Sequence, residues 1–158
     1  HYTMSRMIKD YFDRFYIKEA NRSSSLCENN YALAREIVNW KENVVSKWND
    51  VLPVDIQLSD SLKNSTNNGE PIEATIKLNT AGLTSDIKIE LVVHSEIDGE
   101  TKFYNTYPLK VIDAEGDILT YQLRLHLKDD GVFKYSFRVY PWNEKLPHRQ
   151  DFAYMKWI

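Results

Sequence analysis

The chain has 158 residues, a formal net charge of −3 and a sequence pI near 5.8, and 42% of its residues are hydrophobic. This length and composition suit one ordinary domain with a helical addition, and they exclude an intrinsically disordered chain. The slightly acidic balance argues against nucleic acid as a partner, because proteins that bind nucleic acid carry clustered basic residues.

The single cysteine, Cys27, excludes an internal disulfide and fits a reducing compartment. The sequence contains no apolar run of about 18 residues and no signal-peptide pattern, so we expect no membrane partner and a cytoplasmic location. The chain begins at His1 instead of a methionine. This start predicts a fragment or a processed product.

Apolar residues predict two amphipathic helices in the first third of the chain. Between Thr3 and Tyr16 they recur at steps of three and four, and a second stripe starts near Asn30 and runs to Val51. Ser25 and Glu28 have the spacing of a capping box, although the polar segment 21–30 is equally compatible with one continuous helix. Pro53 is expected to close this half. The two stripes consist of Met4, Met7, Ile8, Tyr11, Phe12 and Phe15, and of Leu33, Ile37, Trp40, Val44, Trp48 and Val51.

Beyond Pro53 the hydrophobic period changes to two, which is typical of strands with one exposed face. In the third strand, Lys88, Glu90, Val92 and His94 are assigned to that exposed face. Turns are predicted at Asp98-Gly99 and at 129–131. The predicted strands cover 54–58, 72–78, 87–94, 101–107, 119–127, 133–140 and, as a last edge strand, 152–157.

We therefore predict a mainly β fold with an N-terminal helical segment. The β part is expected to be an immunoglobulin-like antiparallel β-sandwich of about seven or eight strands. The predicted domains are a helical segment over 1–52 and a β-sandwich over 53–158.

No residue pattern indicates an active site. His94 and His126 lack a third ligand at a diagnostic spacing, Asp129-Asp130 is typical of a turn, and Cys27 has no motif around it. We accordingly predict no catalytic, cofactor-binding or metal-binding residue in this chain.

Several aromatic side chains are candidates for binding a sugar. Tyr104, Tyr107, Tyr140 and Trp142 lie on or near predicted loops, where rings can stack on sugars. The competing interpretation is packing in the core, because aromatic residues make up 13% of the chain and most must be buried. Tyr104, Tyr107 and Trp142 are the candidate glucan contacts.

Three stretches carry a resemblance to a known family. The run from Thr3 to Tyr11, followed by Phe15-Tyr16, resembles the end of the catalytic body in α-glucan phosphorylases. The segment with Ala34-Arg35, Trp40-Lys41 and Val44 to Trp48 resembles the helix that follows in the shorter bacterial branch. The end of this chain resembles the C-terminal ending of the same branch, at Phe137–Pro141, Leu146–His148 and Lys156-Trp157.

The resemblance implies a noncatalytic C-terminal domain whose partners are the catalytic α/β domains of the parent enzyme. That enzyme uses phosphate to release glucose 1-phosphate from α-1,4-glucans and carries pyridoxal phosphate, whose binding residues have no counterpart in this chain. Tyr11 and Phe15 are the candidate docking residues, unless the first helix folds back on the second. The alternatives are a free-standing carbohydrate-binding module that takes α-glucan, and an adhesion-type sandwich that binds another protein.

Overall fold

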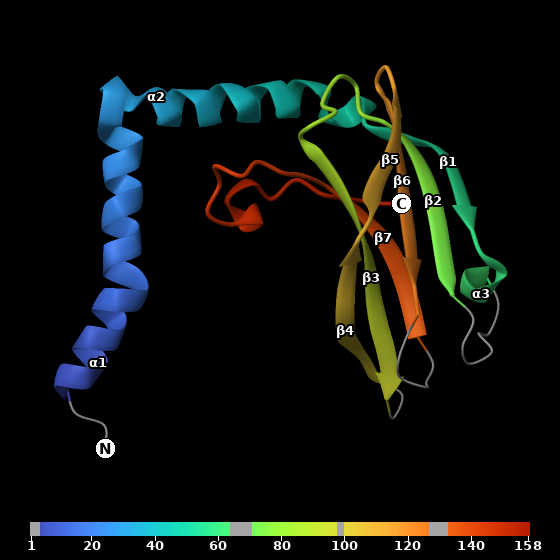
Figure 1. Cartoon of the computed structure of the whole chain (residues 1–158), viewed down its shortest axis with the longest axis horizontal. Coiled ribbons are helices and arrows are strands. Elements are labelled where there is room, and N and C mark those ends of the chain that lie inside the picture. The colour runs from blue at the N-terminus through green and yellow to red at the C-terminus, as the bar shows by residue number, and fades with distance from the viewer. Residues whose placement is uncertain (1–3, 64–70, 98–99, 127–132) are drawn as a thin grey trace. The chain divides into compact units, whose positions relative to one another are not determined.

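The computed structural model describes residues 4–63, 71–97, 100–126 and 133–158 (Figure 1). Contacts divide the chain into two compact units. The helical unit comprises the residues up to Asn43, and the β unit comprises Val44–Ile158. Val44 and Trp48, which continue the helical stripe, are buried within the β unit.

The helical unit contains α1 (Met4–Tyr11), a π-helical turn η1 (Phe12–Tyr16) and most of α2 (Ile17–Lys47). Four consecutive residues interrupt α2. Glu28 has an extended backbone, and Asn29, Asn30 and Tyr31 have φ of 49, 57 and 61°. Asparagine tolerates this left-handed region, which explains why the break falls at the pair of asparagines. The second apolar stripe thus begins directly after the break, close to its predicted start.

Of the two alternatives at Ser25, the structure favours the continuing helix over the capping box. The Ser25 hydroxyl donates to the carbonyl oxygen of Asn21 at 2.9 Å, a contact one helical turn back, and residues 21–27 are helical. A serine bonded in this way lies inside a helix and does not start one.

The described residues of the β unit form eight strands in two four-stranded antiparallel sheets, with the orders β1-β2-β6-β5 and β4-β3-β7-β8 (Figure 1). This arrangement confirms the mainly β fold with an N-terminal helical segment. The strands are β1 (Leu52–Leu58), β2 (Ile72–Asn79), β3 (Ile87–Ile97), β4 (Glu100–Pro108), β5 (Lys110–Glu115), β6 (Ile118–Leu125), β7 (Phe133–Pro141) and β8 (Lys156–Trp157). Short helices are η2 (Trp48–Asp50), α3 (Asp60–Lys63) and η3 (Arg149–Phe152).

The core lies between the two sheets and is built from the alternating residues that the period of two predicts. One inward-facing residue links the sheets directly: the Tyr121 hydroxyl on β6 donates to the carbonyl oxygen of Ile87 on β3 at 3.0 Å. The buried apolar residues that follow this alternation are Ile72, Ala74, Ile76, Leu78, Ile87, Ile89, Leu91, Val93, Leu119, Tyr121, Leu123, Phe137 and Val139.

One strand was not predicted, and another is shorter than predicted. β5 was not predicted, because every one of its residues is exposed and a register shift between Val111 and Asp113 disrupts the alternation. The last strand is limited to Lys156–Trp157, and η3 occupies the start of the range predicted for it. Pro53 lies inside β1, at the edge of its sheet, where a missing N–H donor is tolerated. The turns predicted at Asp98-Gly99 and 129–131 lie outside the described residues.

The predicted exposed face of β3 is wrong at two positions. Glu90 and Val92 are both only 4% exposed. Glu90 contacts arginines from β7 and from η3, which lies in the C-terminal segment (residues 142–158). An alternation within one strand carries no information about such remote neighbours. A buried glutamate is unusual unless it is paired, and the two arginines pair Glu90.

Candidate functional site

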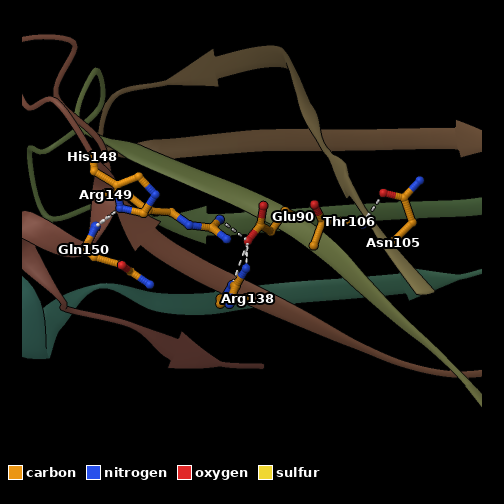
Figure 2. Close-up of polar contacts among 7 residues, drawn as sticks. All are labelled: Glu90, Asn105, Thr106, Arg138, His148, Arg149 and Gln150. Carbon is orange, nitrogen blue, oxygen red and sulfur yellow. Dashed lines mark hydrogen bonds and ion pairs between the residues drawn. The ribbon is translucent and has the colours of Figure 1, made fainter. Parts of the chain in front are cut away.

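Glu90 accepts hydrogen bonds from two arginines (Figure 2). Its Oε1 atom accepts from Nε of Arg138 at 2.7 Å and from Nη1 of Arg149 at 2.7 Å, and Nη2 of Arg138 bonds to the same oxygen. The Glu90 side chain is 6% exposed, whereas those of Arg138 and Arg149 are 19% and 40% exposed. In this cluster the carboxylate is therefore buried, and the guanidinium groups are closer to the surface.

Local structure explains how the two arginines meet Glu90. Arg138 on β7 is the direct register partner of Glu90 on β3, so the pairing of the strands brings these side chains together. Arg149 comes from η3. A capping box starts that helix, because His148 Nδ1 accepts from the Gln150 N–H at 3.1 Å and Asp151 accepts from the His148 N–H at 3.3 Å.

A cavity of about 240 Å³ opens beside this cluster, between β7 and the C-terminal segment. Its wall includes Arg138, Tyr140, Arg149, Gln150, Phe152 and Tyr154. The centroids of the Phe152 and Tyr154 rings lie 4.7 Å apart, so the wall combines two packed aromatic rings with two guanidinium groups.

Tyr140 links the cavity to the charged cluster. Burial raises the pKa of the Tyr140 phenol and the Glu90 carboxylate adds to the rise, while Arg149 and Arg138 partly offset it. The Arg149 guanidinium also lies over the Tyr140 ring, 5.6 Å from its centroid. Tyr140 is therefore a neutral hydroxyl group at neutral pH.

The C-terminal segment is tied to the β unit at both ends. The Trp142 N–H donates to the carbonyl oxygen of Asp86 at 2.7 Å, and the Ile158 N–H donates to that of Phe137 at 3.0 Å. Lys156 Nζ donates to the carbonyl oxygen of Trp48 at 2.6 Å. The apolar ending of the sequence is thus an integral part of the β unit.

A second surface lies on the helical unit and is apolar. Met7, Ile8, Tyr11, Phe12 and Tyr16 line a hollow there, and the exposed fractions of Tyr11 and Phe15 are 54% and 57%. The rings of Tyr11 and Phe15 lie 5.6 Å apart, so the structure brings the two predicted docking residues together. Such a cluster of exposed aromatic residues is typical of a surface that binds a partner.

The three predicted glucan contacts are not brought together. Tyr104 on β4 contacts Phe133, whose strand partner is Ser95, while Trp142 bonds to Asp86 near the opposite end of β3. Ser95 lies nine positions after Asp86, a span of roughly 30 Å in a strand. Tyr107 pairs with Leu91 between them. Glucan contact at each residue stays a prediction.

The other described side chains considered from the sequence show no shared site, and Asp129-Asp130 lies outside the described residues. His94 contacts the Phe103 ring edge-on at 6.2 Å, and Cys27 is an exposed free thiol. Among residues 4–63, 71–97, 100–126 and 133–158, no group of three or more His, Cys, Asp or Glu side chains is arranged to hold a metal ion. In this described part of the chain, no helix is both long and apolar enough to cross a membrane.

Sequence reasoning missed Glu90, Arg149 and the cavity beside them. One signal was present in the sequence: Glu90 lies in a strand where every second residue is apolar, and Arg138 is the only charged residue between Ser136 and Tyr140 of another strand. Pairing them required the strand register, which the alternation alone does not specify.

Comparison with known proteins agrees with the resemblance noted in the sequence. The family described as "Glycogen phosphorylase C-terminal domain" matches residues 48–158. The chain is also 26% identical, over 163 aligned residues, to maltodextrin phosphorylase of Thermococcus litoralis. That alignment covers 99% of this chain and 18% of the archaeal protein. No solved structure matches the chain.

The family match includes η2, the eight strands of the described residues and the residues that line the cavity. The alignment with the archaeal protein extends over the helical unit as well. The chain therefore belongs to the glycogen phosphorylase C-terminal domain family.

Proposed function

We propose that this chain is the noncatalytic C-terminal domain of an α-glucan phosphorylase, and that its helical unit docks the β unit onto the catalytic domains. The exposed ring pair of Tyr11 and Phe15 carries this proposal, because a soluble protein seldom leaves two adjacent aromatic rings more than half exposed without a partner. The family match and the 18% coverage of the archaeal phosphorylase support a role as part of a larger enzyme.

The parent enzyme, in this proposal, cleaves α-1,4-glucan with phosphate in the cytoplasm and releases glucose 1-phosphate. Pyridoxal phosphate would be bound by the catalytic domains and not by this chain. The β unit contributes assembly and stability. We classify it as an immunoglobulin-like sandwich, because its first sheet has the order A-B-E-D of such domains and its second contains C-F-G with one added strand, when β1 to β8 are lettered A, B, C, C′, D, E, F and G.

Positioning of glucan by this domain is the finer part of the proposal. The wide separation of Tyr104 and Trp142 weighs against one continuous sugar-binding platform on the β unit. A free-standing carbohydrate-binding module is for this reason the weaker alternative.

Docking is tested by replacing both rings, Tyr11→Ser and Phe15→Ser, in the full-length enzyme. Loss of two aromatic contacts at an interface is expected to cost about 2–4 kcal/mol. We expect a lower melting temperature of the catalytic domains and a loss of activity on heating. The matched control replaces Lys9 and Asp13, two exposed polar residues of the same helical segment, with serine. Unchanged stability and activity in the double ring variant would exclude docking through this face.

A further inference from the structure

The cavity beside Glu90 has an excess of positive charge. Two guanidinium groups, Arg138 and Arg149, share one carboxylate, and a single oxygen of that carboxylate makes the three contacts with them. A guanidinium carries more N–H donors than these contacts use. One net positive charge and several donors of Arg138 and Arg149 thus remain at the cavity wall, to which both residues contribute.

The position of Arg149 is determined before any ligand arrives. Its Nη1 atom is held by Glu90 at 2.7 Å, its guanidinium lies over the Tyr140 ring, and the capping box fixes the turn that carries it. Fixing a long side chain in advance reduces the entropy that binding would otherwise cost. A planar guanidinium held in this way is suited to an oxyanion, because its N–H groups match two oxygens at once.

The remaining wall restricts the size and kind of ligand. The cavity of about 240 Å³ is smaller than the roughly 300–1,000 Å³ of pockets for drug-sized ligands, which favours a small molecule. Phe152 and Tyr154 contribute aromatic rings to the wall, and Gln150 adds an amide. Such a wall suits a compact ring that carries one anionic group.

We propose that this cavity binds a phosphate monoester, with the phosphate group on Arg149 and Arg138 and the body of the ligand against Phe152 and Tyr154. Free phosphate shares the same recognition chemistry at the arginines. The site consists of residues of the β unit alone and does not depend on docking of the helical unit.

The experiment is an NMR titration of the amide signals of the 158-residue chain at constant ionic strength. Glucose 1-phosphate and inorganic phosphate are added separately, each up to about 10 mM, which suffices to detect dissociation constants in the millimolar range. We expect saturable shifts of the Arg149, Gln150 and Ala153 amides. Tighter binding of glucose 1-phosphate assigns the site to esters, and equal binding assigns it to free phosphate.

Three variants connect the shifts to the arginine. Arg149→Gln is expected to weaken binding about tenfold or more, because it removes a charge-assisted contact while the Arg138–Glu90 pair remains. Arg149→Lys keeps the charge but loses the planar fork, so we expect a smaller loss of at least about twofold, and this variant decides the question if the glutamine variant does not fold. Arg124→Gln removes an exposed arginine that pairs with Glu73 on the other sheet and serves as the control.

The proposal is overturned if neither compound causes saturable shifts. It is equally overturned if folded Arg149 variants bind as tightly as the original chain, or if Arg124→Gln weakens binding as much as Arg149→Gln does. A binding loss confined to the Arg149 variants supports it.

Discussion

Lys156 in β8 donates from Nζ to the carbonyl oxygen of Trp48, the first residue of η2, at 2.6 Å. The same ammonium group reaches the carbonyl oxygens of Val51 at 2.9 Å and Asn49 at 3.2 Å. Helix ends leave carbonyl groups without intrahelical partners, and a lysine satisfies them. The C-terminal strand and the start of the β unit are therefore stabilised together.

Replacing Lys156 with methionine tests this link. The variant keeps an apolar side chain beside the Trp48 ring but removes all three donors, so we expect the free energy of unfolding to fall by about 1–2 kcal/mol. Urea unfolding measures the change. Lys77→Met, at an exposed position of β2, serves as the control and should shift stability by no more than about 0.5 kcal/mol. Equal effects of the two substitutions would show that the cap contributes nothing.

Glu90→Gln is expected to destabilise the β unit more strongly. The substitution leaves Arg138, which is largely buried, without its anion, and loss of one partner from a buried ion pair costs about 3–5 kcal/mol. Because Arg149 is partly exposed, the lower part of that range applies. Chemical unfolding of Glu73→Gln gives the comparison, since Glu73 pairs with Arg124 on an exposed face and such pairs contribute about 0–1 kcal/mol. A loss at Glu90 no larger than at Glu73 contradicts a structural role of the cluster.

Burial of the Tyr121 phenol is expected to make the stability of the β unit depend on pH in the alkaline range. Burial raises the pKa of this phenol far above the ordinary tyrosine value of 10.0. The Tyr121 phenol therefore stays protonated in the folded state at pH values at which it ionises in the unfolded state. Its contribution to the free energy of unfolding is fully present below pH 10 and is lost as the pH rises beyond that value. Tyr121→Phe should lower stability by about 1 kcal/mol at pH 7, because the bond to Ile87 is lost, but it should show a smaller decline above pH 10. Urea unfolding at pH 7, 9 and 10.5 measures both effects, and parallel declines of the two proteins would refute the assignment.

The chain alone is not expected to bind α-glucan through Trp142. Lys88 Nζ lies 3.9 Å from the centroid of the Trp142 ring and occupies one face of it. In a native gel containing starch or glycogen, we expect no retardation of the chain, with a starch-binding protein as positive control. Retardation that disappears in Trp142→Ala would instead support a carbohydrate-binding module.

The alternation of apolar residues was sufficient to predict six of the strands and both helical stripes. The alternation predicts these strands because every second side chain of a strand points to the same face, as the buried residues Ile76 and Ile89 illustrate. It fails where burial comes from a remote segment. Glu90 has the sequence context of an exposed residue, but it pairs with Arg138 and Arg149, which are 48 and 59 residues away.

The candidate sites divide in the same way. Tyr11 and Phe15 were predictable because both lie on one face of a single helical segment, where spacing determines neighbourhood. The grouping of Tyr104, Tyr107 and Trp142 rested on loop composition, which says nothing about which end of β3 each ring lies near. The cavity requires the path of residues 143–155, and no period in that segment predicts it.

The most direct measurement of the central claim is amide hydrogen exchange of residues 4–16, compared between this chain alone and the full-length enzyme. These residues are exposed in the chain, so their amides should exchange readily there. If the helical unit docks onto the catalytic domains, exchange of α1 and η1 should slow by about tenfold or more in the full-length enzyme, and exchange of exposed β5 should not change. Equal exchange rates of residues 4–16 in both proteins would contradict the docking role.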